Sequence, residues 1–122
     1  MAFKYFTANP VRETNDCIIR STANATGREW REVMKEFCDI AIEKYDMPNA
    51  YPVALEYMNR YGYEEEYIHP SEPTTVEQFC KDHPTGRYIV LLEDHALSVI
   101  DGDVYDLQDC MKSLVVSFWT VK

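Results

Sequence analysis

The last third of the chain places the strongest constraint on the fold. Residues 88–92 are five consecutive apolar residues, a run that is typical of a central strand. A second apolar run, residues 95–100, is separated from residues 104–106 by Asp101-Gly102, which is a strong signal for a tight hairpin. Residues 114–121 add a further apolar run that contains Phe118 and Trp119. The sequence therefore predicts that this third of the chain forms an antiparallel sheet.

Helical periodicity dominates the region before this sheet. Apolar residues at spacings of three and four predict helices over residues 16–25, 28–45 and 53–61, and a short helix after Thr74. Asn15 or Asp16 is expected to cap the first helix, and capping boxes are expected at Thr26 with Glu29 and at Thr74 with Glu77. Short strands are expected at residues 3–6, as an edge strand, and at residues 63–68.

These elements predict one α+β domain that spans residues 1–122. A chain of 122 residues suits a single domain with one modest core. Helices that come first in the chain and a meander that follows predict N-terminal helices packed on one side of a C-terminal antiparallel sheet.

The net charge and the spacing of the cysteines exclude several classes of binding partner. A net charge of −9 with scattered basic residues argues against a nucleic-acid surface and against anionic membranes. No stretch approaches the roughly 18 apolar residues of a membrane span, and the N-terminus lacks a secretion signal, so we expect a cytoplasmic protein. The four cysteines contain no Cys-x-x-Cys pair. We therefore expect reduced thiols, no metal and no cofactor, and a peptide, protein or small molecule as the partner.

Cys17 is the strongest candidate for a chemical role. It lies where a polar turn gives way to the first predicted helix, and the oriented N–H groups of a helix start lower the pKa of a thiol. The other three cysteines fall inside or beyond predicted elements, where a small buried hydrophobe is the simplest interpretation. That interpretation remains open for Cys17 too.

His95 and Asp106 are the candidates for a base and its orienting group. His95 begins a predicted strand, and Asp106 lies just past the hairpin, where it can reach back across the two strands. Asp101 and Asp103 belong to the turn, where Asp is favoured for its own backbone hydrogen bonds. Cysteine first, histidine later and carboxylate last is the order of papain-like thiol enzymes. An oxyanion hole would use the backbone N–H of Cys17 and a donor such as Asn15 or Asn9.

Longer segments around these residues resemble a known group of proteins. Residues 15–21 (Asn-Asp-Cys-Ile-Ile-Arg-Ser) and 25–33 are similar to the opening of small papain-like cysteine-peptidase-type proteins of bacteria, phages and mobile elements. Residues 75–79, 84–90 and 95–106 resemble the second half of the same group.

The resemblance implies a papain-like fold and a Cys17–His95–Asp106 triad that performs acyl transfer. Two positions depart from the pattern. Papain carries a glutamine six residues before its nucleophile, where this chain has Val11, and many relatives have Thr-Trp where this chain has Leu107-Gln108. The first departure means that the oxyanion donor must come from elsewhere, and the second affects a wall of the pocket.

Three functions follow from these observations. The first is a cysteine-dependent hydrolase of the peptidase or isopeptidase type. The second is a catalytically silent papain-like fold that acts as a protein-binding module or phage effector against a host factor, using its acidic surface and the cluster Tyr57, Tyr61, Tyr63 and Tyr67. The third, deamidation or transglutamination, uses the same triad with a different acyl acceptor.

Overall fold

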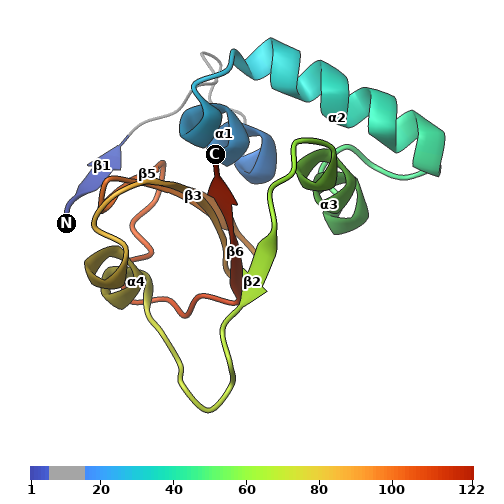
Figure 1. The fold of residues 1–122 in the computed structure, drawn as a ribbon. Helices are drawn as coiled ribbons and strands as arrows, with labels where there is room; N and C mark the ends of the chain where they lie inside the picture. The colour runs from blue at the N-terminus through green and yellow to red at the C-terminus, as the bar shows by residue number, and fades with distance from the viewer. Residues whose placement is uncertain (6–15) are drawn as a thin grey trace.

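A computed structural model describes residues 1–5 and 16–122, and these form an α+β fold (Figure 1). The described residues make four helices and one six-stranded sheet. In chain order the elements are β1 (Phe3–Tyr5), α1 (Cys17–Thr26), α2 (Trp30–Lys44), α3 (Tyr51–Arg60), β2 (Glu65–Tyr67), α4 (Val76–Asp82), β3 (Arg87–Leu91), β4 (Ala96–Ile100), β5 (Asp103–Asp106) and β6 (Ser117–Val121).

The sheet has the order β1-β5-β4-β3-β6-β2 and is mixed as a whole. The prediction that the last third of the chain is antiparallel is confirmed for β3, β4, β5 and β6, but β6 lies beside β3 and not beside β5, so the expected meander was wrong. β3, β4, β5, β6 and β2 pair antiparallel, but the edge strand β1 runs parallel to β5. Tight turns fix the direction of neighbouring strands. β1 is far from β5 in sequence, so no such turn fixes its direction.

Helices cover both faces of the sheet, so the expectation that all helices lie on one side was wrong for α4. The apolar run in β3 explains this arrangement, because successive side chains of a strand point to opposite faces. Ile89 packs into the core beneath α1, α2 and α3, and Val90 packs with Val76 and Phe79 of α4 on the other face. Figure 1 shows α4 apart from the other three helices, across the curved sheet.

The hairpin between β4 and β5 confirms the prediction from Asp101-Gly102. Both turn residues have positive φ, 50° at Asp101 and 80° at Gly102. That geometry matches the right-handed twist of the flanking strands and favours an Asp-Gly pair. The hairpin sets β5 beside β4, with Ser98 opposite Tyr105.

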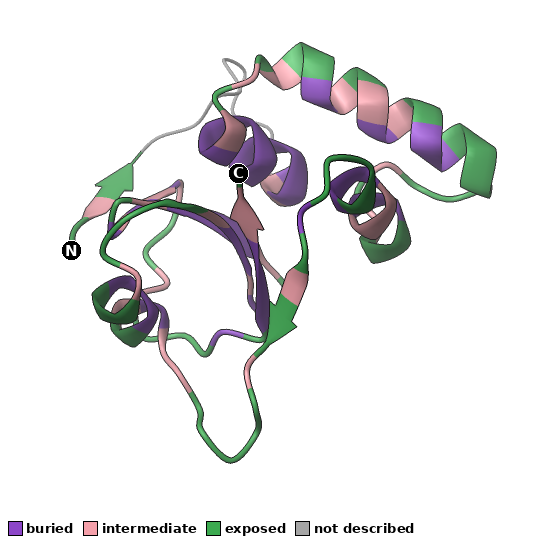
Figure 2. Cartoon of the chain, viewed as in Figure 1, coloured by how far each residue is buried: buried purple, intermediate pink, exposed green. Residues whose placement is uncertain are grey.

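Helix α1 lies at the centre of the molecule and is buried on nearly all sides (Figure 2). It was expected to bury one face, but residues 18–25 are all buried between the sheet and α2. The buried hydroxyls of Ser21 and Thr22 find their acceptor within the helix, since both donate to the carbonyl of Ile18. A helix enclosed in this way is held rigidly, and so is the residue at its start.

Two of the expected helix caps differ from the structure. Thr26 makes no capping box with Glu29, because the N-cap residue of α2 is Glu29 itself, and the Thr26 hydroxyl donates to the carbonyl of Thr22 and accepts from the N–H of Arg28. The short helix α4 is capped by Thr75 rather than Thr74, and the Thr75 hydroxyl accepts from the backbone N–H of Gln78 at 3.1 Å. The prediction of a threonine cap for α4 was therefore right in kind, but the capping residue is one position later than expected.

Replacing Thr75 with alanine is expected to lower the free energy of unfolding by about 1 kcal/mol, because the N–H of Gln78 loses its acceptor. Thr74→Ala is the matched control, since the Thr74 hydroxyl donates to the carbonyl of Glu72 and caps no helix. Urea denaturation of the two variants measures the difference. An equal loss in both variants would contradict this assignment of the cap.

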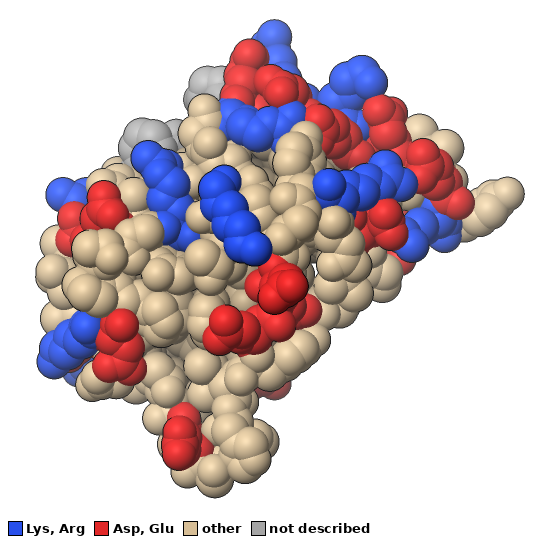
Figure 3. Space-filling view, viewed as in Figure 1, with Lys and Arg blue, Asp and Glu red and all other residues tan. Residues whose placement is uncertain are grey.

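Charged side chains of both signs intermix over the helical end of the molecule (Figure 3). Many form ion pairs, such as Lys35 with Asp39 and Arg60 with both Glu43 and Glu56. Within the two described segments, no helix combines the length and the apolar character that crossing a bilayer requires.

Candidate active site

Cys17 is the first residue of α1 and is partly exposed. The first N–H groups of a helix have no acceptor within it, and they create a positive potential at the helix start. Helix α1 runs against β4, β3 and β5, so its beginning is fixed relative to the sheet. The helix therefore presents the Cys17 thiol at an electropositive position beside the central strands.

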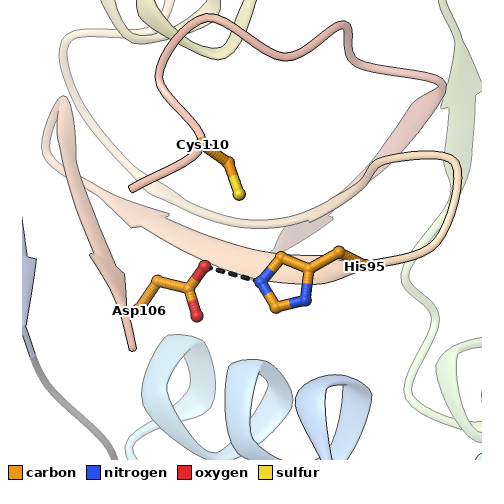
Figure 4. A group of neighbouring side chains, drawn as sticks. All are labelled: His95, Asp106 and Cys110. Carbon is orange, nitrogen blue, oxygen red and sulfur yellow. Dashed lines mark hydrogen bonds and ion pairs between the residues drawn. The ribbon is translucent and has the colours of Figure 1, made fainter. Parts of the chain in front are cut away.

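His95 and Asp106 lie together at the same end of the sheet, as the sequence predicted. His95 is the residue before β4, and Asp106 is the last residue of β5. The hairpin between those strands brings the two side chains together, with His95 Nε2 2.6 Å from Asp106 Oδ2 (Figure 4). Because Nε2 faces Asp106, Nδ1 is the ring nitrogen that remains for Cys17.

The pKa values of Cys17 and His95 are shifted in opposite directions, and each shift favours the charged form of its side chain. Burial alone would raise the pKa of Cys17, but the hydrogen bond to His95, the backbone N–H of Ala96 and the positive charges of His95 and Arg20 lower it below its ordinary 9.0. Burial acts to lower the pKa of His95, but the bonds to Asp106 and Cys17 outweigh it and raise that pKa to about 9. Both shifts favour the thiolate–imidazolium pair over the neutral thiol and imidazole.

A buried arginine connects the start of α1 to Asp106. Arg20 is 3% exposed, and its guanidinium lies 2.5 Å from Asp16 Oδ1 and 3.3 Å from Asp106 Oδ1. Asp16 is the N-cap residue of α1, but its side chain makes no cap, because Oδ2 accepts from the indole N–H of Trp30 at 2.9 Å. One buried cation thus joins two buried carboxylates from different parts of the chain.

Asp106 is held in one orientation by donors on both of its oxygens. Oδ1 accepts from Arg20 and from the backbone N–H of Leu107 at 2.7 Å, while Oδ2 faces His95. The side chain is 1% exposed. Its partners fix which oxygen faces the imidazole, and the geometry can therefore orient His95 as a proton-transfer group.

Two depressions meet at His95. The main cleft has a volume of about 750 Å³, and its walls include Cys17, His95, Glu65 and Trp119. A second groove of about 980 Å³ runs past Ile68, Leu114 and Cys110. The main cleft and the second groove share Tyr67, Leu92, Glu93, Asp94, His95 and Val116. A chain-like ligand in the main cleft could thus continue past His95.

The expected oxyanion donor Asn15 lies outside the described residues, as do Asn9 and Val11. Two other amide side chains, Asn49 and Gln108, line the main cleft. Gln108 occupies one of the two positions at which the chain departs from the papain-like pattern, so that departure leaves a polar side chain in the wall of the cleft.

One group of described residues could hold a metal ion. The donor atoms of His95, Asp106 and Cys110 lie within 4.8 Å of one another, and Figure 4 shows the Cys110 thiol pointing toward the other two. His95 Nε2 and Asp106 Oδ2 are already bonded to each other. A metal at this position would have to break that bond, so metal binding and the Cys17–His95–Asp106 arrangement exclude one another.

The structure brings together the three residues that the sequence singled out, and it adds Arg20, Asp16 and Cys110. The Asp16–Arg20 pair has a recognisable i,i+4 spacing, but the spacing gives no sign that the pair is buried. The chain matches no known family model, no curated protein sequence and no solved structure.

Proposed function

We propose that this protein is a cysteine-dependent hydrolase of amide bonds, of the peptidase or isopeptidase type, with a papain-like fold. The observation that supports this proposal most is the Cys17–His95–Asp106 arrangement at the open cleft, with Asp106 oriented by buried donors. A lowered thiol pKa beside a fixed histidine is the requirement of nucleophilic thiol catalysis.

The proposed reaction has two halves. The Cys17 thiolate attacks the carbonyl carbon of the substrate, and His95 Nδ1 gives its proton to the departing amine, which leaves a thioester. Nδ1 then takes a proton from water, the resulting hydroxide attacks the thioester, and the thiolate and carboxylic acid separate. Asp106 stays ionised throughout and keeps the imidazole in place. The backbone N–H of Cys17 is the proposed donor to the oxyanion.

The binding-module alternative finds less support in the described residues. Tyr57 and Tyr63 are 1% and 8% exposed, and Tyr61 packs against both of their rings. Tyr57 and Tyr63 are therefore part of the core, and only Tyr61 and Tyr67 of the four are exposed, at 41% and 65%. A silent fold would also have no need of a lowered pKa at Cys17.

Hydrolysis is best tested on a complex mixture of peptides, with new chain ends identified by mass spectrometry. The wild-type protein is expected to create ends that are absent with Cys17→Ala, because the nucleophile is missing. Cys38→Ala is the matched control, since Cys38 lies in α2 and does not line the cleft. Its products are expected to equal those of the wild type. Identical products with and without Cys17 would contradict the proposal, as would no products at all.

The pH dependence of kcat/KM on a substrate found in this way is expected to be bell-shaped. The acid limb reports deprotonation of Cys17, and it should lie below the ordinary thiol value of 9.0 because the Cys17 pKa is lowered. The alkaline limb is expected at about pH 9, where His95 loses the proton that the leaving group needs. A profile that only rises through pH 9 would mean that His95 is not the acid.

A further inference from the structure

The charged side chains in the main cleft are mostly acidic. Its walls carry Glu65, Glu93 and Asp94, and no Lys or Arg is among the described residues that line it. The proposed thiolate–imidazolium pair is neutral overall and does not offset these charges. A cleft with charges of one sign raises the local concentration of ligands of the opposite sign.

The Glu65 carboxylate is bound by three hydroxyl groups. Its Oε1 accepts from the hydroxyls of Tyr51 and Tyr67, and its Oε2 accepts from the hydroxyl of Ser117 at 2.6 Å. Burial and the bond to Glu65 raise the pKa of Tyr51, so that hydroxyl stays protonated as a donor. The carboxylate is thus held in place in the wall of the cleft, and none of these three donors is a basic side chain.

Aromatic rings surround this carboxylate. Tyr51 at the start of α3 stacks on Trp119 of β6, with centroids 6.3 Å apart, and Tyr67 is 65% exposed. Trp119 lies opposite Glu65 in the β2–β6 pairing, and Tyr67 lies opposite Ser117. We call Tyr51, Glu65, Tyr67, Ser117 and Trp119 the Glu65 cluster, and all five line the main cleft.

From this arrangement we propose that the Glu65 cluster binds the positively charged side chain, ammonium or guanidinium, of a basic residue next to the amide bond that Cys17 attacks. The proposal rests on the proposed function and names its substrate class. A carboxylate gives charge complementarity to such a group, and the faces of tyrosine rings attract cations. The continuation into the second groove leaves room for chain beyond His95, which favours a basic residue within a chain over a free terminal amine.

The charge preference can be measured on Cys17 itself with three methanethiosulfonate probes of similar size. One carries a trimethylammonium group, one a sulfonate group and one is uncharged. In each case the Cys17 thiolate attacks the sulfenyl sulfur, a disulfide forms and methanesulfinate leaves. The full chain is labelled, and the rate at Cys17 is measured by mass spectrometry of the peptide that contains this residue. Each rate is then divided by the rate of the same probe with free 2-mercaptoethanol.

The normalised rate of the cationic probe is expected to exceed that of the anionic probe, and Glu65→Gln is expected to reduce this ratio by about tenfold. Glu66→Gln is the matched control, because it removes the same charge from the same strand. Glu66 is exposed and does not line the cleft, so its ratio is expected to match that of the wild type. Glu93→Gln, at an exposed position, gives a second test if Glu65→Gln fails to fold.

Equal ratios in the wild type, Glu65→Gln and Glu93→Gln would overturn the cation site. The proposed function would still stand in that case, provided that the uncharged probe reacts with Cys17 faster than with a free thiol. A slow reaction with the uncharged probe would instead contradict the proposed function itself. The two failures are therefore distinguishable.

Protection of Cys17 from the uncharged probe identifies where the positive charge must lie. N-acetyl-lysine amide carries its charge on the side chain, norleucine amide on the α-amine, and N-acetyl-norleucine amide carries none. Protection by the lysine compound alone is expected. Stronger protection by norleucine amide would show that the cluster binds a terminal amine and would overturn the assignment to a basic side chain.

Discussion

Replacing Arg20 with methionine is expected to lower the free energy of unfolding by about 3–5 kcal/mol. The Arg20 side chain is buried and lies between Asp16 and Asp106, both of which are also buried. Methionine fills a similar volume but removes the cation, so two carboxylates remain in the interior without it. Removing one partner of a buried ion-pair network is among the most destabilising single changes that a protein can suffer.

Arg60→Met is the matched control for this experiment. Arg60 also pairs with two carboxylates, Glu43 and Glu56, but all three side chains are substantially exposed. Water can solvate the carboxylates that remain, so only a small part of the Arg20 effect is expected. Urea denaturation of both variants measures the difference. Equal losses would mean that the Arg20 network is no more important than a surface ion pair.

Replacing Asp106 with asparagine is expected to reduce catalysis by about 10³–10⁴-fold, by analogy with other proteins in which the carboxylate behind a catalytic histidine was changed to an amide. The direction of the effect follows from the contacts of Asp106. Arg20 and the N–H of Leu107 both donate to Oδ1, so the asparagine oxygen is expected to take that position. The amide NH₂ then faces His95 Nε2 and donates to it.

This orientation disfavours the imidazolium, because Nε2 becomes an acceptor and cannot carry a proton. The pKa of His95 should fall from about 9, and the pKa of Cys17 should rise as its partner loses charge. Alkylation of Cys17 at pH 6 is therefore expected to slow in Asp106→Asn. The control is Asp109→Asn, an exposed carboxylate that accepts only from the N–H of Met111 among the contacts described. A fast reaction at pH 6 in Asp106→Asn would contradict this role for Asp106.

Much of the fold follows from local signals in the sequence. The Asp101-Gly102 turn predicted the pairing of β4 with β5, because a hairpin fixes both neighbour and direction. The place of β6 beside β3 was not predicted, because no tight turn joins these two strands. The parallel pairing of β1 with β5 could not be predicted, since it joins segments with no local connection. The predicted position of α4, on the same side of the sheet as the other helices, was wrong for a different reason. β3 was recognised as central, but its alternate residues were not assigned to opposite faces.

The three principal site residues could be predicted because each has a local signal: a helix start for Cys17, a strand start for His95 and the end of a hairpin for Asp106. Arg20 could not, because its importance depends on burial and on a carboxylate distant in sequence. The sequence also contains no sign of the Glu65 cluster, because a run of three acids such as residues 64–66 is typical of a solvated surface. Only the pairing of β2 with β6 sets Glu65 beside Trp119.

The central claim is that Cys17 is activated by His95, and the rate of Cys17 alkylation by iodoacetamide between pH 4 and 9 tests it most directly. The rate is read at Cys17 by mass spectrometry in the wild type and in His95→Ala. The account predicts fast labelling of the wild type well below pH 8 and markedly slower labelling of His95→Ala over the same range. Labelling that rises only above pH 8, equally in both proteins, would show that Cys17 is an ordinary thiol and would contradict the account.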